Sequence, residues 1–398
     1  MRPLGANSMS ETCDLCHASA LERVYQPVGS VRGMFVHICS QCGLLQSLPR
    51  IDHAPRRAAA VSSGADWGNV RYGKGFRTKA CLSIMTAHAD FRSPLTMLDV
   101  GSNRGSFARA FLDGAPLARI ICVEPDERVA DSCGSLSRAE LVRTRIEQTR
   151  FSDGSFDIVH SCHTLEHLAS PAATLADHWR VLKPGGLLVL DVPNVALVGG
   201  DDVLEEWFID KHLYHFSKRT LACLLDAAGF EIIDGPDEND RENILVAAVK
   251  RSFAGRPVRA NPLAVDEAMS LMQSYVTTRA QNLTLMKQVA AEIERLAPHG
   301  VALWGAGRLF DALVLHGGFD PKKLRLLIDV HLKKHVPERH GVAVSGPEAL
   351  SAADPAFIVV MSRAFAGEIA ALASETVPKA EMLLYSDLLA RARVKLAA

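Results

Sequence analysis

Short apolar runs alternate with helix-like patterns between residues 72 and 250, and this alternation constrains the fold more than any other feature of the sequence. Such an alternation is typical of β-α-β units, in which helices connect the strands of a parallel sheet. The predicted strands are 96–100, 119–123, 156–161, 186–192 and 244–250. We therefore expect an α/β fold built on a parallel sheet.

The same alternation resumes near residue 301, where the predicted strands are 301–304, 324–329 and 356–361. Before it, a linker containing Pro257 and Pro262 leads into a long helical pattern, which we interpret as a packing helix that joins two domains. The apolar stripe of this helix consists of Met269, Met272, Val276, Leu283, Met286, Ala290 and Ile293. The chain is thus expected to divide into residues 9–71, 72–250, 251–297 and 298–398.

Four cysteines near the N-terminus form two C-x2-C pairs separated by 22 residues: Cys13, Cys16, Cys39 and Cys42. Each pair bends the chain so that two thiolates reach one ion, and an all-sulfur ligand set favours zinc. Four protein ligands leave no open coordination position, so we predict a structural zinc ion in residues 9–71, with unmetallated thiols as the alternative. The odd total of 9 cysteines, without a secretory signal, argues against a disulfide framework.

The charge of the chain is balanced, with 44 Lys+Arg and 45 Asp+Glu among 398 residues and a net charge of -1. Binding nucleic acid through its phosphates requires an excess of positive charge, so we expect no nucleic-acid partner. No apolar run approaches the ~18 residues of a membrane span, and the N-terminus lacks the apolar segment of a secretory signal. We expect a cytoplasmic enzyme with no membrane partner, and the sequence leaves its oligomeric state open.

A glycine turn of the form G-x-x-x-G follows the predicted strand 96–100 and precedes a helix. Gly101 and Gly105 begin and end this turn, and glycines there let the backbone approach a ligand closely. The dinucleotide fingerprint G-x-G-x-x-G is missing, which favours a nucleoside ligand over a pyrophosphate. Glu124 ends the next predicted strand, about 20 residues further on, where an acid can bind both hydroxyls of a ribose.

Together with the segments 151–159 and 180–186, these motifs resemble class I S-adenosylmethionine-dependent methyltransferases in their order and spacing. The resemblance covers roughly residues 95–250 and implies a Rossmann-like core that binds S-adenosylmethionine. Glu124 would bind the ribose, and Ile146 with Glu147 would lie beside the adenine. The implied cofactor-binding residues are Asp99, Gly101, Ser102, Gly105, Glu124, Pro125, Ile146, Glu147 and His163. A degenerate domain that binds nothing is the alternative.

The order of a four-cysteine module, a methyltransferase core and a C-terminal domain resembles bacterial sugar C-methyltransferases. Those enzymes methylate nucleotide-linked keto-deoxysugars. In residues 298–398, the turn at Gly305 and Gly307 and a predicted strand ending in Asp329 look like the second, Rossmann-like domain of that family. The resemblance implies that the acceptor is a small molecule, a nucleotide-linked sugar.

The loop of residues 207–217 leads into a predicted helix at 218–228, with Ser217 as the N-cap. It follows the strand 186–192, so it lies on the ligand side of the sheet. Resemblance to sugar C-methyltransferases implies that His212 is a catalytic base and that His167 is a second active-site histidine. Tyr214 is a third candidate, which would orient a substrate hydroxyl or stabilise an oxyanion.

We predict a zinc-containing, S-adenosylmethionine-dependent methyltransferase that acts on a nucleotide-activated sugar or related carbohydrate, at carbon and with a histidine base. Its fold class is α/β, with a class I methyltransferase core, a small N-terminal zinc module and a C-terminal Rossmann-like domain. Ile209 and Lys211 stand where sugar C-methyltransferases commonly have Tyr and Glu, which favours an alternative, methyl transfer to oxygen or nitrogen of a sugar or other small molecule. An alternative of another class is a non-catalytic zinc-ribbon binding protein, which would not bind S-adenosylmethionine.

Overall fold

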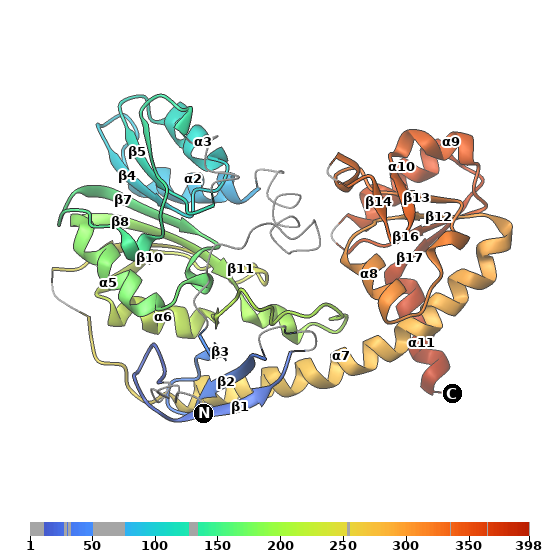
Figure 1. The fold of residues 1–398 in the computed structure, drawn as a ribbon, viewed down its shortest axis with the longest axis horizontal. Helices are drawn as coiled ribbons and strands as arrows, with labels where there is room; N and C mark the ends of the chain where they lie inside the picture. The colour runs from blue at the N-terminus through green and yellow to red at the C-terminus, as the bar shows by residue number, and fades with distance from the viewer. Residues whose placement is uncertain are drawn as a thin grey trace, which may run out of the picture. The chain divides into compact units, whose positions relative to one another are not determined.

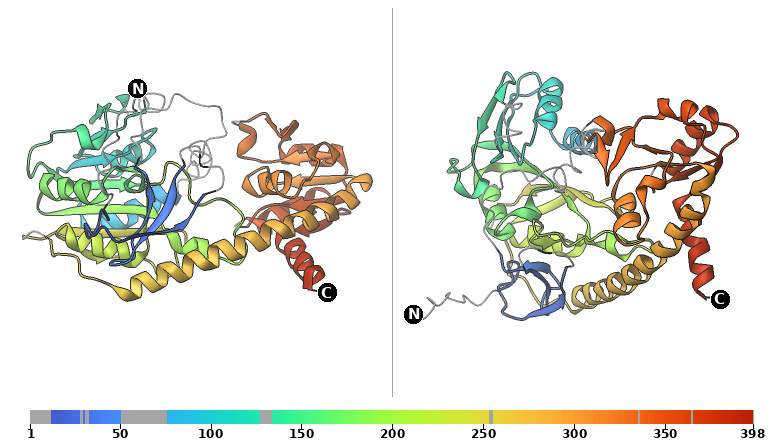
Figure 2. Two further views of the ribbon diagram at one scale, coloured as in Figure 1. Left: turned by 60° about the horizontal axis from the view of Figure 1, so that its bottom comes forward. Right: turned by 45° about the vertical axis from the view of Figure 1, so that its right-hand side comes forward.

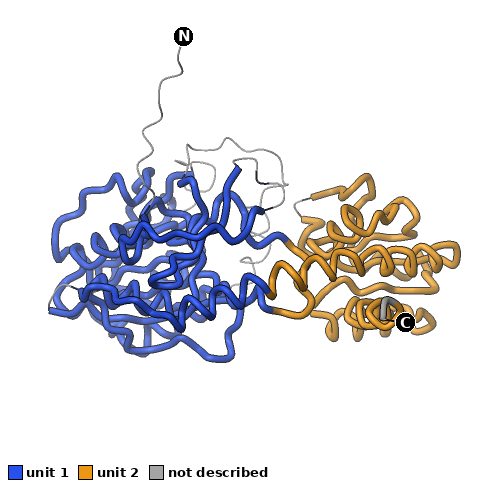
Figure 3. The backbone as a smooth tube through the Cα atoms, turned by 90° about the horizontal axis from the view of Figure 1, so that it is seen from below, with its two compact units in different colours: residues 1–58, 74–199, 206–273 blue, residues 59–73, 200–205, 274–398 orange. Residues whose placement is uncertain are grey.

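The computed structural model describes residues 12–27, 30, 33–50, 76–126, 134–252, 255–334, 336–363 and 365–397 (Figure 1). The chain divides into two compact units, which Figure 3 draws in different colours. Unit 1 comprises residues 1–58, 74–199 and 206–273, and unit 2 comprises residues 59–73, 200–205 and 274–398. The cysteine module therefore shares one unit with the predicted core, and the long helix is divided between the units.

Unit 1 contains a seven-stranded sheet among its described residues. In spatial order its strands are β10 (Phe230–Asp234), β11 (Asn243–Lys250), β8 (Leu182–Pro193), β7 (Phe156–Cys162), β4 (Thr96–Val100), β5 (Arg119–Val123) and β6 (Ala139–Val142). The five strands from β8 to β6 are parallel, which confirms four predicted strands, and β6 is a strand that the sequence analysis missed. The segment 244–250 is a correction, because β11 runs antiparallel to both β8 and β10. A short connection from β10 allows only an antiparallel pair.

Helices cover both faces of this sheet. Successive side chains of each strand point to opposite sides, so apolar residues on both faces need a packing partner. On one face, Met97 of β4 packs with α2 (Phe76–His88) and α3 (Ser106–Gly114). On the other face, Leu98 packs with α5 (Pro171–Val181) and α6 (Lys218–Ala227). The predicted cap of α6 is confirmed, since the Ser217 side chain accepts a hydrogen bond from the Thr220 backbone N–H.

The cysteine module forms a four-stranded antiparallel sheet with a strand from the core. Its order is β1 (Leu21–Tyr25), β2 (Phe35–Cys39), β3 (Leu45–Leu48) and β9 (Tyr214–His215). Ala172, at the start of α5, also donates a backbone hydrogen bond of 2.9 Å to Asp14 Oδ2. The module is therefore built into unit 1, and its fourth strand directly follows the loop that carries His212.

Unit 2 contains a six-stranded sheet among its described residues. Its strands, in spatial order, are β14 (Glu338–Arg339), β15 (Val342–Ser345), β13 (Leu326–Ile328), β12 (Val301–Trp304), β16 (Phe357–Val360) and β17 (Glu381–Leu384). All neighbouring pairs are parallel except β14 with β15. The helices of this unit are α8 (Arg308–Leu315), α9 (Leu350–Ala353), α10 (Ala366–Thr376) and α11 (Tyr385–Ala397).

The long helix α7 (Pro262–Leu296) is continuous, as Figure 2 shows. In unit 2, Met286 and Ile293 pack against the same core as β12 and α8. Met269 and Val276 of the predicted stripe are 38% and 41% exposed, whereas Met272 and Tyr275 are buried. The buried residues follow one another at intervals of three or four along the whole helix, so they form one continuous face, and Met269 and Val276 lie at its margin.

Within the described ranges, no helix has both the length and the apolar content that crossing a membrane requires.

Candidate active site

The candidate cofactor site lies at the carboxyl ends of β4, β5 and β7. Val100 pairs with Val123 on one side and with Ser161 on the other, so the three strands end at one edge of the sheet. In open α/β sheets, ligands bind at this edge. The strand order therefore brings Gly101, Glu124 and the segment after β7 together, although they are far apart in sequence.

The glycine turn after β4 has the left-handed backbone conformation that glycine tolerates best. Gly101 has φ 78° and Gly105, which precedes α3, has φ 72°. A Cβ at Gly101 would collide with Thr164 Oγ1. The first glycine thus permits close packing against the segment after β7, a contact that the sequence could not reveal.

Gly101→Val is expected to lower both the thermal stability and the affinity for S-adenosylmethionine. A β-branched residue at positive φ costs about 1–2 kcal/mol, and the collision with Thr164 adds to that cost. Gly154→Val is the matched control, since Gly154 has φ 60° but has nothing within 4 Å of its Cβ position. Thermal denaturation and calorimetric titration of both variants test the prediction. Equal losses of stability would contradict a role for the Thr164 contact.

Glu124 ends β5 and is buried at the predicted ribose position. Its Oε2 accepts a hydrogen bond of 2.9 Å from the Asn103 backbone N–H, and its Oε1 accepts one of 2.9 Å from that of Asp126. Burial raises the pKa of the carboxyl above its ordinary value, against the effect of these two hydrogen bonds. Each carboxylate oxygen has a second lone pair, so the group can still accept hydrogen bonds from ribose hydroxyls.

Glu124→Ala is expected to weaken S-adenosylmethionine binding by ~1.5–3 kcal/mol, the contribution of hydrogen bonds to a charged group. The variant also removes the acceptor for Asn103, which lies in the glycine turn. Glu140→Ala is the control, because Glu140 is an exposed glutamate on the neighbouring strand β6. Calorimetric titration measures the effect, and an affinity equal to that of the control would reject the ribose assignment.

Two buried polar atoms next to the glycine turn lack a hydrogen-bond partner among the described residues. These atoms are Asp99 Oδ2 and Ser102 Oγ. Asp99 Oδ1 accepts a hydrogen bond of 2.7 Å from His160 Nδ1, and Phe107 stacks on the His160 ring with 3.7 Å between centroids. Buried polar atoms without partners are uncommon, and polar groups of a bound cofactor would satisfy them. Sequence reasoning missed His160, because only the register of β7 against β4 places it beside Asp99.

The other predicted cofactor-binding residues lie in the segments that follow β5, β6 and β7. Ile146 is buried in the short 3-10 helix 146–148 that follows β6, and both carboxylate oxygens of Glu147 are buried without a hydrogen-bond partner in the described residues. Pro125 is exposed after β5. His163 Nε2 lies 3.0 Å from Asn243 Oδ1 of β11, which places its ring near the antiparallel part of the sheet. The roles of these residues in binding stay predictions.

Glu166, His167 and His212 form a cluster after β7. Their ligand atoms all lie within 4.8 Å of one another, and the two histidine rings are 4.8 Å apart between centroids. The Leu213 backbone N–H donates a hydrogen bond of 2.8 Å to Glu166 O, which holds the 207–217 loop against the segment after β7. The structure thus brings together the two histidines that the sequence named, and it adds Glu166.

The pKa values of His212 and Glu166 shift in opposite directions within this cluster. Burial, followed by the nearby His167 and Lys211, lowers the pKa of His212 well below its ordinary value, so that His212 is neutral at pH 7. Burial raises the pKa of Glu166 to about 8, and the charge of Lys211 acts in the opposite direction. A neutral histidine can accept a proton, and a protonated carboxyl can donate one.

Tyr214, the third predicted catalytic residue, is part of the packed interior. It lies in β9, its side chain is almost completely buried, and its hydroxyl donates a hydrogen bond of 2.8 Å to Ala169 O. The Arg50 guanidinium lies 5.5 Å from the centre of its ring. Burial raises the pKa of the phenol. These contacts fix the position of the ring, and the catalytic role of Tyr214 stays a prediction.

The four N-terminal cysteines form two knuckles with the same backbone geometry. The His17 N–H donates to Cys13 O, and the Gly43 N–H donates to Cys39 O, each over 2.9 Å. His17 and Gly43 both have positive φ, at 60° and 75°. Each knuckle therefore turns after its second cysteine in the same way.

The sulfur atoms of the two knuckles converge. Cys13 Sγ lies 3.5 Å from Cys42 Sγ, Cys16 Sγ lies 3.4 Å from Cys39 Sγ, and all four lie within 4.8 Å of one another. Tetrahedral coordination with Zn–S bonds of about 2.3 Å places sulfur atoms about 3.8 Å apart. The donor set and its spacing therefore fit one zinc ion.

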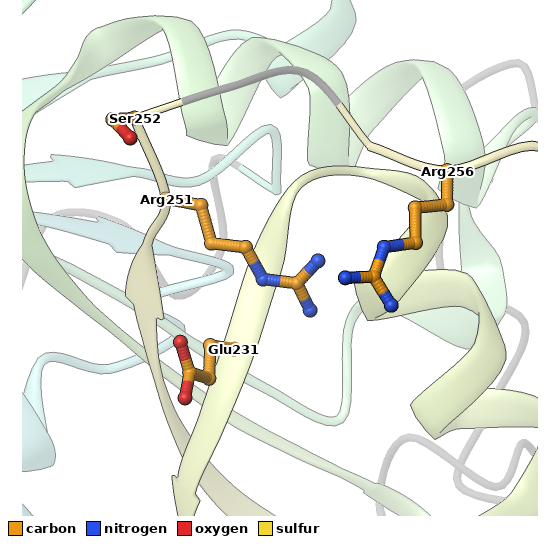
Figure 4. Close-up of a pocket in the computed structure, with 4 residues that line it drawn as sticks. All are labelled: Glu231, Arg251, Ser252 and Arg256. Atoms are coloured by element: carbon orange, nitrogen blue, oxygen red, sulfur yellow. The ribbon is translucent and has the colours of Figure 1, made fainter.

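An open pocket lies at the opposite edge of the seven-stranded sheet. Glu231, Arg251, Ser252 and Arg256 line it, as Figure 4 shows. Arg251 follows the end of β11, and because β11 runs antiparallel to β8, this position lies near the amino end of β8. Arg251 also donates a hydrogen bond of 2.6 Å to Asp226. The pocket is therefore separate from the candidate active site.

Comparisons with known proteins identify the class of the core. Residues 72–234 match a family model described as a methyltransferase domain. An uncharacterized methyltransferase of Mycobacterium avium is 37% identical over 106 residues, which are 26% of this chain and 41% of that protein. These residues are thus a class I S-adenosylmethionine-dependent methyltransferase domain, which confirms the predicted enzyme class for this part of the chain.

A protein of Mycolicibacterium smegmatis described as a probable S-adenosylmethionine-dependent methyltransferase is 29% identical over 174 residues, which are 40% of this chain and 66% of that protein. Among solved structures, an S-adenosylmethionine dependent methyltransferase from Mesorhizobium loti has a TM-score of 0.36 and 15% identity, covering 42% of this chain and 96% of that chain. A Burkholderia thailandensis 1,6-didemethyltoxoflavin-N1-methyltransferase has a TM-score of 0.36 and 18% identity, covering 57% of this chain and 100% of that chain. Neither structural likeness bears on the substrate of this chain.

Proposed function

We propose that this protein transfers the methyl group of S-adenosylmethionine to a carbon atom of a nucleotide-activated sugar or related carbohydrate, with His212 as the base. The observation that carries the proposal is the pair of His167 and His212 rings beside the cofactor edge of the sheet. The balanced charge of the chain supports a small-molecule acceptor over nucleic acid. The absence of a membrane partner and the cytoplasmic location stay predictions.

S-adenosylmethionine, when bound, supplies a methyl group on a sulfonium, which is already activated for transfer. The residues that would hold it are Asp99, Ser102, Glu124 and the glycine turn. The neutral His212 would take the proton from an acceptor carbon next to a carbonyl group, and the electron pair left there would bond that carbon to the methyl group as the methyl–sulfur bond breaks and its electrons go to the sulfur. The hydrogen bond from the Leu213 backbone N–H to Glu166 O fixes the loop that holds His212. This contact keeps the base at a constant position relative to the cofactor edge of the sheet.

Proton exchange in D2O tests the carbon acceptor without methyl transfer. A panel of nucleotide-linked keto-sugars and their reduced alcohols is incubated with the enzyme and S-adenosylhomocysteine, and loss of the carbon-bound proton is followed by NMR. We expect exchange next to the carbonyl of one keto-sugar, and a methyl group at the same carbon when S-adenosylmethionine replaces the product analogue. Methylation of an alcohol without any exchange would overturn the carbon assignment.

Methyl transfer to oxygen or nitrogen is the second candidate. Ile209 and Lys211 support it, because they replace the Tyr and Glu that sugar C-methyltransferases commonly have in this loop. His212 alone suffices as a base for a hydroxyl or amine. A non-catalytic zinc-ribbon protein is the remaining alternative, and S-adenosylmethionine binding in equilibrium dialysis would reject it.

We further propose that Cys13, Cys16, Cys39 and Cys42 bind one structural zinc ion. The matched knuckles and the converging sulfur atoms support it. Four thiolates fill a tetrahedral shell, so this ion would stabilise the module without contacting the acceptor. Elemental analysis of the purified protein would show one zinc ion per chain.

A further inference from the structure

Glu166 is a buried carboxyl that the proposed reaction does not use. Its side chain is 2% exposed, and both of its carboxylate oxygens lack a hydrogen-bond partner among the described residues. Oε1 lies 3.6 Å from His167 Nε2 and 3.8 Å from His163 Nδ1. A buried carboxyl in this situation requires a physical explanation, because an unpaired charge there would be costly.

The hydrogen bond of His167 determines which of its ring nitrogens faces Glu166. His167 Nδ1 lies 2.8 Å from Lys211 O. A carbonyl oxygen only accepts hydrogen bonds, so Nδ1 carries a hydrogen atom. In the neutral ring, Nε2 then presents a lone pair toward Glu166 Oε1. An ionised carboxylate opposite this lone pair would repel it, whereas one added proton between the two atoms turns the repulsion into attraction.

We propose that Glu166 is a positioning residue that shares one proton with His167 Nε2 and so keeps a proton donor beside the neutral base His212. The inference rests on the proposed function. When His212 takes the proton from the acceptor carbon, the C–H electron pair forms a C=C bond and the carbonyl oxygen becomes negative. The carbonyl group then re-forms, the C=C electron pair bonds the acceptor carbon to the methyl carbon, and the electrons of the methyl–sulfur bond would leave with the sulfur. The proton held by Glu166 and His167 stabilises the negative charge on that oxygen and stays with the pair throughout.

The groups around the pair are consistent with this division of roles. His163 lies next to Glu166, His212 lies next to His167, and the charge of Lys211 acts on both Glu166 and His212. His215 is close enough to His212 to affect its protonation. Burial lowers the pKa of His215 to about 3, and its Nε2 lies 2.9 Å from Ser47 Oγ, so it adds no positive charge. The pKa of Glu166 is raised to about 8 while that of His212 is lowered, and such divergence is typical of acid and base pairs.

Glu166→Gln tests the proposal, because it keeps the size of the side chain but cannot share an ionisable proton. Histidine-labelled full-length protein is titrated by NMR, and protonated carboxyl groups are followed by infrared spectroscopy, without acceptor or cofactor. In the wild type at pH 7 we expect either a protonated His167 or a carboxyl band that Glu166→Gln abolishes. In the variant, the proton affinity of His167 falls about tenfold or more, one unit of pKa.

Turnover provides the second readout. Glu166→Gln is expected to lower kcat roughly tenfold to a hundredfold and to change its pH profile, with KM for S-adenosylmethionine unchanged. Glu166→Asp, which keeps the carboxyl group, is expected to restore part of kcat, and Glu140→Gln is the neutral control.

Three results would overturn the proposal. The first is a neutral His167 at pH 7 without a carboxyl band, and the second is identical His167 titrations in the wild type and Glu166→Gln. The third is one equivalent of a chelator-removable metal ion beyond the cysteine site that Glu166→Gln loses, since the cluster would then hold an ion in place of the proton. The spectra need no acceptor, so a failed methylation assay would reject the proposed function and leave this test intact.

Discussion

His212→Asn is expected to lower turnover by roughly 10²–10⁴ while the affinity for S-adenosylmethionine stays unchanged. Asparagine keeps the approximate size and hydrogen-bonding capacity of histidine but cannot exchange protons near neutral pH. Because His212 lies in a loop and is only partly buried, the substitution should leave the sheet intact. Single-turnover kinetics with calorimetric titration of the cofactor separate the two effects.

The pH profile gives an independent check on this variant. A base acts in its neutral form, and the surroundings lower the pKa of His212 below the ordinary 6.5. Wild-type turnover is therefore lost as the pH falls through that lowered pKa and is present above it. In His212→Asn this acid limb should be absent.

Two further histidine variants make the result interpretable. His167→Asn shows whether the two histidines exchange roles, and His178→Asn removes a buried histidine of α5 that lies outside the cluster. If His212→Asn keeps near wild-type turnover while His167→Asn abolishes it, His167 is the base. If His212→Asn loses stability, binding and turnover in proportion, as expected for a purely packing residue, no base role remains.

Cys39→Ser is expected to unfold the cysteine module, because a structural zinc site contributes on the order of 10 kcal/mol to the folding of such modules. Zinc content and thermal denaturation measure the loss. Cys223→Ser is the matched control, since Cys223 is a partly buried cysteine of α6 outside the cluster. A zinc-free protein with four freely titratable thiols and unchanged stability would reject the site.

The module shares its sheet with the core, so the consequences of Cys39→Ser should reach the active site. β3 pairs with β9, which begins two residues after His212, and Leu213 O accepts a hydrogen bond from the Ser47 backbone N–H. We expect turnover to fall strongly because the His212 loop loses this support. Affinity for S-adenosylmethionine should change much less, because Glu124 and the glycine turn follow β5 and β4 of the seven-stranded sheet, which do not pair with the cysteine module.

Local patterns in the sequence were sufficient for the parallel core, the cap of α6, the two cysteine pairs and the class of enzyme. The first three depend on residues close together in the chain: an apolar run, a serine before a helix, or a C-x2-C spacing. The class of enzyme came from the resemblance of motifs in order over roughly residues 95–250 to a known family. The same reasoning named His212 and His167 through resemblance to a family, and the structure places their rings side by side.

Only the tertiary structure decided which side chains lie next to one another. The sequence did not indicate that the Tyr214 hydroxyl donates a hydrogen bond to Ala169 O, a contact that only the position of β9 produces. Glu166 went unnoticed, because its surroundings come from segments more than forty residues apart, and the burial that raises its pKa exists only in the folded chain. Protonation depends on the local dielectric and on neighbouring groups, which sequence spacing does not determine, and that is the physical reason why the proposed role of Glu166 required the fold.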